Sequence, residues 1–364
     1  MAFMKSGQSN RKKNRRDFLK ILGGGGVVAS SLLASGPIAR ASASTAFQKL
    51  QNVLPKAKKR LPALPVDPAK SIPGLSSLIT PNTDFYRIDI ASDIPAIDVS
   101  RWTLKIHGMV KKPITLTYAD LLKRPLFELD DTMSCVSNPV GGIYIGNARW
   151  LGCRLDDLIK EAGPLANADQ VFSTSQDGFS AGFPLSVLDG RDAMVAVGMN
   201  GQVLPVKNGY PARLVVPGLY GYVSATKWIS DIEITRFDIK QGYWISNGWS
   251  RLGPIKMESR IDTPRHLQEV KIGPTHIAGV AWAPNVGIKA VQVQVDGGAW
   301  MPATLGPQLS GTTWRQWWVK WNATSGRHKI TVRAINAKGE VQSAGIVDPL
   351  PNGAEGLHTI DVTA

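Results

Sequence analysis

Hydrophobic and polar positions alternate in short runs along the first half of the chain. Residues 102–107, 171–175 and 212–216 follow the two-residue period of β-strands, whereas residues 118–122 and 154–162 follow the longer period of α-helices. The strands and helices are mixed without the regular spacing of a dinucleotide-binding βαβ fold. The pattern therefore predicts an α+β or α/β domain.

From about residue 251 onward the pattern is typical of strands. Residues 291–295 alternate valine with glutamine, an Asp-Gly-Gly turn follows at 296–298, and the alternation returns at 330–334. The paired cysteines of antibody domains are absent from this half of the sequence. We therefore expect an all-β, immunoglobulin-like sandwich in residues 251–364.

The first 43 residues have the features of a twin-arginine export signal. Arg15 and Arg16 precede a weakly apolar, glycine-rich stretch at 21–34, which is shorter than the roughly 20 apolar residues of a membrane span. Proteins on this route cross the bacterial inner membrane already folded, usually because they carry a cofactor. We expect export to the periplasm or another extracytoplasmic compartment, and no membrane span in the mature chain.

The remaining chain is long enough for two domains. A lead-in segment is expected at residues 44–75, where Lys, Pro and Ala follow no clear period. The sequence then divides into a first domain at residues 76–250 and the β-rich domain at residues 251–364.

Much of the positive charge belongs to the signal. The formal net charge is +14, and eight of the 42 Lys and Arg residues and one of the 28 acids lie in residues 1–43, which leaves +7 for the rest. No basic run there is interleaved with aromatic residues, so a nucleic-acid-binding surface is not predicted. The remaining surplus suits an anionic substrate, a phosphate-bearing cofactor or an ordinary solvated surface.

The chain has two cysteines, Cys135 and Cys153, which could pair in an exported protein. Cys153 lies in a strand-like run where a buried free thiol is common, so we predict two unpaired thiols. Cys135 lies where a strand gives way to a glycine-bearing loop, without a histidine or second cysteine at zinc or iron–sulfur spacing. It suits a metal whose other ligands come from a prosthetic group; a structural cysteine and a nucleophilic thiol are the alternatives.

Several motifs in order resemble the sulfite oxidase family of molybdopterin-dependent oxidoreductases. Residues 135–142, Cys-Val-Ser-Asn-Pro-Val-Gly-Gly, are similar to the molybdenum-binding core of that family. Further similar segments are 80–87, 145–152, 176–179, 208–213, 216–218 and 227–228. The resemblance extends over residues 76–364 and implies an α+β molybdopterin-binding domain followed by an immunoglobulin-like dimerisation domain.

The resemblance implies molybdenum with molybdopterin as the cofactor and Cys135 as the single protein ligand to the metal. Arg87 would face an oxyanion near the metal, and Tyr243 would be the active-site tyrosine that donates a hydrogen bond. The positions that match cofactor-binding segments of the family are Asn82, Phe85, Tyr86, Asn138, Asp177, Asn208, Arg213, Ser224 and Lys227. Taken alone, Asp177 is part of a turn, and Arg213 and Lys227 are surface charges.

The sequence also departs from the family pattern. Sulfite-oxidising members have arginines after the asparagine of the cysteine loop, whereas Pro139 and Val140 follow Asn138 here. Asn208 occupies a position where histidine is common, and it can still donate and accept hydrogen bonds. A heme-binding Cys-x-x-Cys-His motif is absent from the sequence.

We therefore expect an exported molybdenum oxidoreductase that moves one oxygen atom between water and a small substrate. Sulfite is the first candidate, and a sulfoxide or another small oxyanion is the next. The electrons would leave singly to an external carrier such as a c-type cytochrome, and the β domain implies a two-fold homodimer. The rival hypothesis is a non-catalytic exported binding protein that uses aromatic residues such as Trp314, Trp317 and Trp318 for contacts.

Overall fold

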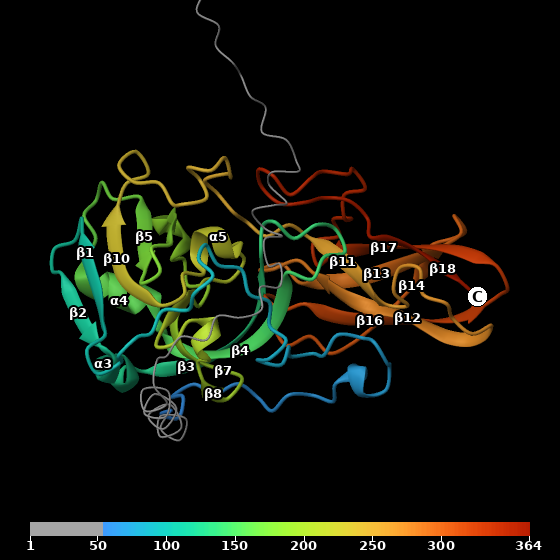
Figure 1. Cartoon of the computed structure of the whole chain (residues 1–364), viewed down its shortest axis with the longest axis horizontal. Helices are drawn as coiled ribbons and strands as arrows, with labels where there is room; N and C mark the ends of the chain where they lie inside the picture. The colour runs from blue at the N-terminus through green and yellow to red at the C-terminus, as the bar shows by residue number, and fades with distance from the viewer. Residues whose placement is uncertain (1–53) are drawn as a thin grey trace, which may run out of the picture. The chain divides into compact units, whose positions relative to one another are not determined.

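The computed structural model describes residues 54–364 (Figure 1). The export signal and its cleavage site lie outside these residues. The division of the chain at residues 43, 75 and 250 stays a prediction. Within residues 54–364, no helix has the length and apolar character needed to cross a membrane.

The first half contains a mixed five-stranded sheet. Its strands, in spatial order, are β2 (Ile114–Thr117), β1 (Thr103–Gly108), β10 (Ile229–Thr235), β5 (Gln170–Ser175) and β6 (Ser180–Pro184). β1 and β10 are parallel, and the other neighbours are antiparallel. The sheet brings the turn after β5 close to the segment around β10, although these are far apart in sequence.

A second five-stranded sheet is antiparallel and carries the cysteine loop. It consists of β3 (Leu126–Ser134), β4 (Ile145–Arg154), β7 (Met194–Met199) and β8 (Gln202–Val203), with β9 (Arg213–Val215) paired to β7. The loop from Cys135 to Tyr144 joins β3 to β4. The predicted change from strand to loop at Cys135 is therefore confirmed.

The helices of the described residues are short. They are α3 (Tyr118–Lys123), α4 (Leu155–Ala162), α5 (Gly221–Ser224) and three 3-10 turns at Pro68–Lys70, Leu185–Val187 and Val206–Asn208. A capping box between Thr117 and Asp120 starts α3, and Gly163, with φ of +68°, ends α4. Both predicted helices are confirmed, each with one boundary displaced by a single residue.

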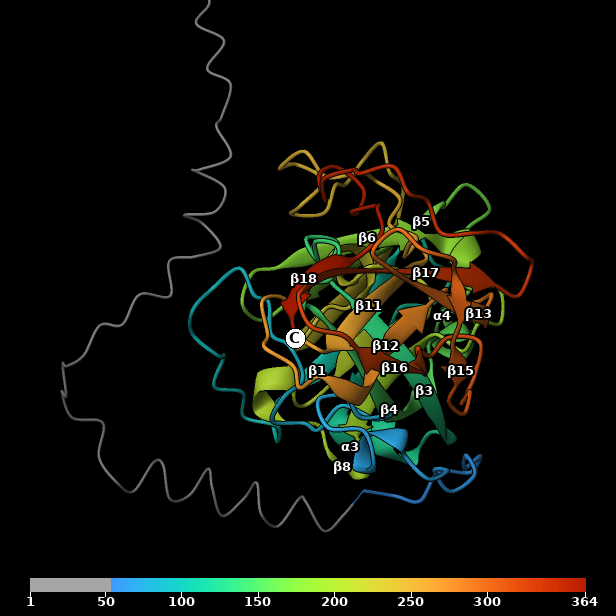
Figure 2. The same cartoon turned by 90° about the vertical axis from the view of Figure 1, so that its right-hand side faces the viewer.

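The second half is built from strands alone (Figure 2). One four-stranded sheet has the order β11 (Glu258–Thr263), β12 (Gly273–Trp282), β16 (Arg315–Ala323) and β15 (Thr304–Leu305). The other four-stranded sheet has the order β14 (Met301–Pro302), β13 (Ile288–Val295), β17 (Arg327–Asn336) and β18 (Thr359–Thr363). Side chains from both sheets, such as Ile277 and Val332, share one buried cluster. This is the arrangement of a β sandwich, and its immunoglobulin-like character stays a prediction.

Two of the tryptophans invoked for surface contacts are in the interior. Trp314 and Trp317 have exposed fractions of 2% and 0%, and the Trp314 indole N–H donates to the Leu78 carbonyl at 3.1 Å. The prediction that they make external contacts is wrong. Trp317 packs in the buried cluster of the sandwich, whereas Trp314 packs with Ile145 and Trp282 in a separate buried cluster.

Candidate functional site

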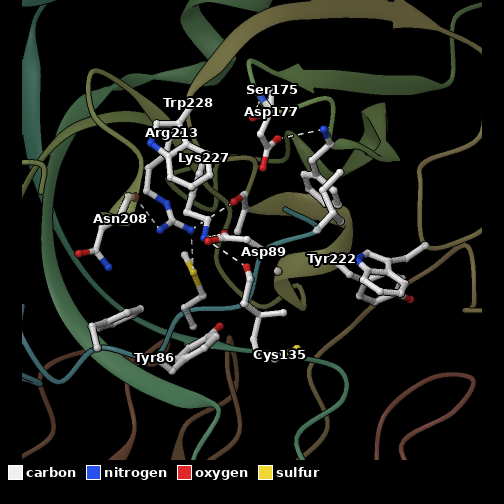
Figure 3. A pocket seen from close by; sticks show the side chains of 18 residues that line it. Tyr86, Asp89, Cys135, Ser175, Asp177, Asn208, Arg213, Tyr222, Lys227 and Trp228 are labelled. Carbon is white, nitrogen blue, oxygen red and sulfur yellow. Dashed lines mark hydrogen bonds and ion pairs between the residues drawn. The ribbon is translucent and has the colours of Figure 1, made fainter. Parts of the chain in front are cut away.

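A cavity lies beside Cys135 in the first half of the molecule (Figure 3). It contains about 700 Å³ of space free of atoms, including the part open to solvent at its mouth. The end of β3, the turn after β5, the start of β9 and α5 all contribute to its wall. The lining residues are Phe85, Tyr86, Ile88, Asp89, Ile90, Met133, Cys135, Ser175, Asp177, Phe179, Asn208, Arg213, Gly221, Tyr222, Ala225, Lys227, Trp228 and Trp244.

Cys135 is held at the wall by its backbone and by its neighbour in the loop. Its N–H donates to the Tyr144 carbonyl at 2.9 Å, and its Sγ lies 2.9 Å from Ser137 Oγ. Burial raises the pKa of the Cys135 thiol, and the hydrogen bond from Ser137 opposes that shift. A thiolate is therefore stable here only beside a positive partner such as a metal ion.

Cys153 is also a free thiol, so the prediction of two unpaired cysteines is confirmed. It lies on β4 in the core, and burial raises its pKa to about 12. Cys153 thus behaves as a small apolar residue, whereas Cys135 borders the cavity.

The loop after Cys135 is closely packed from both sides. Asn138 Oδ1 accepts a hydrogen bond from the Tyr144 N–H at 2.8 Å, and a Cβ atom on Gly142 would overlap that oxygen. From the second half of the chain, the Arg260 guanidinium donates to the Gly142 carbonyl at 2.9 Å. Asn138 does not line the cavity; instead it shapes the loop that carries Cys135.

Arg213 is a buried cation at the inner wall, with an exposed fraction of 4%. Its guanidinium donates to the carbonyls of Asn208 and Ala225 at 3.0 and 3.2 Å and lies over the Trp150 ring. Within residues 54–364, no carboxylate is at ion-pair distance from it. Burial lowers the pKa of Arg213 to about 10, and the Tyr86 and Asp131 side chains oppose that shift. Burial also raises the pKa of Asp131 well above its usual value, so Asp131 does not neutralise Arg213 and an anion in the cavity would be favoured.

Lys227 and Arg87 share one carboxylate. Asp89 forms ion pairs with Lys227 Nζ and with Arg87 Nε, and its side chain has an exposed fraction of only 5%. Lys227 also donates to the Ile88 carbonyl at 3.2 Å, and Arg87 donates to the Ser92 carbonyl at 3.2 Å. Lys227 and Asp89 line the cavity, whereas Arg87 lies behind Asp89 and does not.

Two aromatic rings form one side of the cavity. Phe85 stacks on Tyr86 with 5.3 Å between ring centroids and meets the edge of Trp150. Burial raises the pKa of Tyr86 well above its usual value, so the phenol stays neutral. Asn82 lies outside the lining and donates to the Met199 carbonyl at 3.3 Å. It therefore fixes the segment that presents the two rings.

Asn208 and Ser224 differ in exposure to the cavity. Asn208 lines it, and its Oδ1 is buried with no hydrogen-bond partner in the part of the chain that the structure describes. Ser224 Oγ donates to the Tyr220 carbonyl at 3.0 Å inside α5, and Ser224 is not a lining residue. Asn208 is thus poised to accept a hydrogen bond from a bound group.

The mouth of the cavity contains Asp177 and aromatic side chains. Asp177 Oδ1 accepts from the Phe179 N–H at 3.0 Å, which is the turn expected from the sequence, and Asp177 also lines the cavity. Tyr243 has an exposed fraction of 39% and contacts Phe179 and Trp244, both of which are lining residues. Tyr243 itself is one layer away from the cavity.

Of the predicted site residues, the structure brings seven to the cavity: Phe85, Tyr86, Cys135, Asp177, Asn208, Arg213 and Lys227. It places five outside the lining: Asn82, Arg87, Asn138, Ser224 and Tyr243. The roles assigned to all of them stay predictions. Sequence reasoning missed Asp89 and Trp244, although each is within two residues of a predicted site residue.

The residues present fit a cofactor that combines an anionic group, a polar heterocycle and a metal. Arg213 offers a buried guanidinium without a carboxylate, and Asn208 offers a buried acceptor without a donor. Phe85 and Tyr86 offer a flat wall, and Cys135 offers a thiol. The guanidinium suits a phosphate, and the thiol suits a soft metal. The buried acceptor and the flat wall suit the edge and the face of a pterin.

Comparison with known proteins gives the same picture. The family model for the oxidoreductase molybdopterin binding domain matches residues 91–244. The uncharacterized oxidoreductase YuiH of Bacillus subtilis (strain 168) is 29% identical over 182 residues, which are 49% of this chain and 89% of that protein. Sulfite oxidase of Gallus gallus is 27% identical over 315 residues, covering 72% of this chain and 68% of the enzyme.

Two further comparisons concern a longer relative and a solved structure with the same fold as this chain. Mitochondrial sulfite oxidase of Homo sapiens is 27% identical over 70% of this chain, and the match spans only 55% of the human enzyme. The sulfane dehydrogenase SoxCD from Paracoccus pantotrophus has the same fold, with a TM-score of 0.67, 24% identity and 92% of both chains covered. The chain belongs to the sulfite oxidase family of molybdopterin-dependent oxidoreductases, with molybdenum and molybdopterin as its cofactor.

Proposed function

We propose that this protein moves one oxygen atom between water and a small sulfur compound, either a sulfite-like oxyanion or a sulfoxide. It exchanges the two electrons with an external carrier, such as a c-type cytochrome. The observation that carries this proposal is the free thiol of Cys135 at a cavity that also holds the buried guanidinium of Arg213, which forms no ion pair within residues 54–364. Relatives named sulfite oxidase support the choice of a sulfur substrate.

The cavity residues divide the work of holding the cofactor. The Cys135 thiolate would ligate the metal, while Arg213, Lys227 and Asn208 would bind the phosphate and the pterin edge. Phe85 and Tyr86 would form the wall against the heterocycle, and Asp177 would accept hydrogen bonds at its rim. When bound, molybdenum supplies two-electron oxygen-atom transfer chemistry.

Residues outside the lining are proposed to position those inside it. Asn138 shapes the loop of Cys135, Asn82 fixes the segment of Phe85 and Tyr86, and Ser224 closes the short helix α5. Arg87 and Tyr243 are proposed to orient the substrate from the second layer, Arg87 through Asp89 and Tyr243 through its contacts at the mouth.

Export, domain division and assembly are further parts of the proposal. Arg15 and Arg16 support export through the twin-arginine route to the periplasm or another extracytoplasmic compartment. We propose a signal at residues 1–43, a lead-in at 44–75, a catalytic domain at 76–250 and a dimerisation domain at 251–364. A two-fold homodimer follows from the resemblance of the last part to a dimerisation domain.

Metal analysis and a substrate panel test the proposal. Protein purified from molybdate-fed cells should contain about one molybdenum per chain, in line with a single cysteine ligand. Holoprotein should turn over sulfite or a small sulfoxide with an artificial redox dye. Metal-free protein, or holoprotein inert toward every sulfur compound and oxyanion of the panel, would contradict the proposal. The rival hypothesis of a non-catalytic binding protein is not supported, because the chain is an oxidoreductase by family and because Trp314 and Trp317 are buried.

A further inference from the structure

We infer that Asp89 determines the charge of the substrate that this site prefers, by weakening the binding of doubly charged oxyanions relative to uncharged substrates of the same chemistry. The inference rests on the proposed oxygen-atom transfer at a small sulfur compound. Asp89 is not one of the residues for which the sequence suggested a role.

The carboxylate of Asp89 lies in the wall of the same cavity as Cys135 (Figure 3). It is almost fully buried, and its two oxygens serve different cations: Oδ2 pairs with Arg87 and Oδ1 pairs with Lys227. The segment from Ile88 to Ile90 is apolar on either side of it. Asp89 therefore faces one basic side chain at each of its two oxygens, and neither oxygen is left unpaired in the wall.

The cations around the cavity are already committed. Arg87 gives Nε to Asp89 and Nη2 to the Ser92 carbonyl, so the group expected to clamp an oxyanion is neutralised. Arg213 and Lys227 are the two lining cations, and both suit the cofactor phosphate. With the cofactor bound, the described lining residues offer no unpaired cation to a substrate anion, and Asp177 adds a second carboxylate.

The loop after Cys135 does not compensate for this. Pro139 and Val140 follow Asn138 in this loop and bring no basic group, and the remaining wall is largely aromatic and aliphatic. Because Asp89 neutralises the basic groups beside it, a dianion moved from water into the cavity gains little attraction to offset its lost solvation, whereas an uncharged sulfoxide loses little solvation. A carboxylate that removes positive charge from the site disfavours anions and is an element of the kind that creates specificity.

The test compares holoenzymes of wild type, Asp89→Asn, Asp89→Glu and Asp98→Asn. Asp98→Asn removes an exposed carboxylate of the same segment and is the matched control for net charge. Two quantities are measured. The first is kcat/KM, for sulfite with an oxidised dye as electron acceptor and for dimethyl sulfoxide with a reduced dye as electron donor. The second is the Kd of sulfate by calorimetry, which needs no turnover. We expect Asp89→Asn to lower the Kd of sulfate and to raise kcat/KM for sulfite, each by about tenfold or more, since a unit negative charge a few ångströms away is removed. The kcat/KM for dimethyl sulfoxide should change by less than about twofold.

Asp89→Glu keeps the charge, so it should retain the wild-type selectivity, as should Asp98→Asn. Molybdenum content and circular dichroism check that each variant is folded and loaded. Should Asp89→Asn load poorly, Asp89→Ser removes the same charge with a smaller side chain. Sulfate binding that is no tighter in a loaded, uncharged variant overturns the inference. If wild type turns over neither substrate, the proposed function fails, and the sulfate measurement still decides the role of Asp89.

Discussion

Cys135 is a thiol that burial keeps protonated unless a positive partner is present. Cys135→Ser replaces the soft ligand with a hydroxyl, and we expect turnover to fall by at least about a thousandfold while the fold persists, since the side chain is nearly isosteric. The assay is dye-coupled turnover together with molybdenum content and thermal unfolding. Cys153→Ala is the control; it should cost about 1 kcal/mol of stability and leave activity unchanged. Activity retained in Cys135→Ser would contradict the ligand role.

Arg213 is a buried guanidinium whose partners are carbonyl oxygens and a thioether rather than a carboxylate. Arg213→Gln should reduce the molybdenum content about tenfold, because the proposed phosphate partner is lost. The cofactor-free protein should lose no more than about 2 kcal/mol, since the lost hydrogen bonds are partly offset by removal of a buried charge. Arg236→Gln, at a cation paired with Asp238 outside the cavity, should load normally. Normal loading of Arg213→Gln would remove it from the cofactor site.

The connection between β3 and β4 is the element on which the site depends. Gly142→Ala would place a methyl group against Asn138 Oδ1 and Pro139, so we expect about 2 kcal/mol of lost stability and poorer retention of molybdenum. Gly311 has open space around it, so Gly311→Ala should change neither quantity. Denaturant unfolding and metal analysis make the comparison. An unchanged Gly142→Ala variant would show that the loop tolerates displacement without losing the site.

Buried charge also sets how the stability of the whole molecule varies with pH. Glu258 on β11 is buried, and burial raises the pKa of its carboxyl from 4.5 to about 8. The folded state therefore holds a proton that the unfolded state releases between pH 4.5 and 8, so this contribution to stability is lost as pH rises through that range. Relative to Glu258→Gln, wild type should lose on the order of 3 kcal/mol from pH 4.5 to 8.

The measurement for Glu258 is the free energy of unfolding of both proteins at several pH values. Glu269→Gln, at an exposed carboxyl, is the control and should follow wild type. Parallel curves for wild type and Glu258→Gln would show that the side chain is solvated in solution.

Local patterns account for most elements of the fold. The periods at 118–122 and 154–162 predicted both helices, because each amphipathic face and its cap are encoded within a few neighbouring residues. The change from strand to loop at Cys135 is also predicted locally, because a glycine-bearing loop follows directly in the sequence. Trp317 was misjudged, because whether a tryptophan of a strand faces the core or the solvent depends on the register of the partner sheet.

The sequence by itself determined the kind of chemistry: a lone cysteine before a glycine-bearing loop, and a series of motifs that resemble one family in order. Only the tertiary structure decided which charges meet. Asp89 and Lys227 are 138 positions apart and become partners because the segment after Phe85 folds over the start of β10. Pairing over such a distance follows from the packing of whole sheets, which no local pattern of residues records.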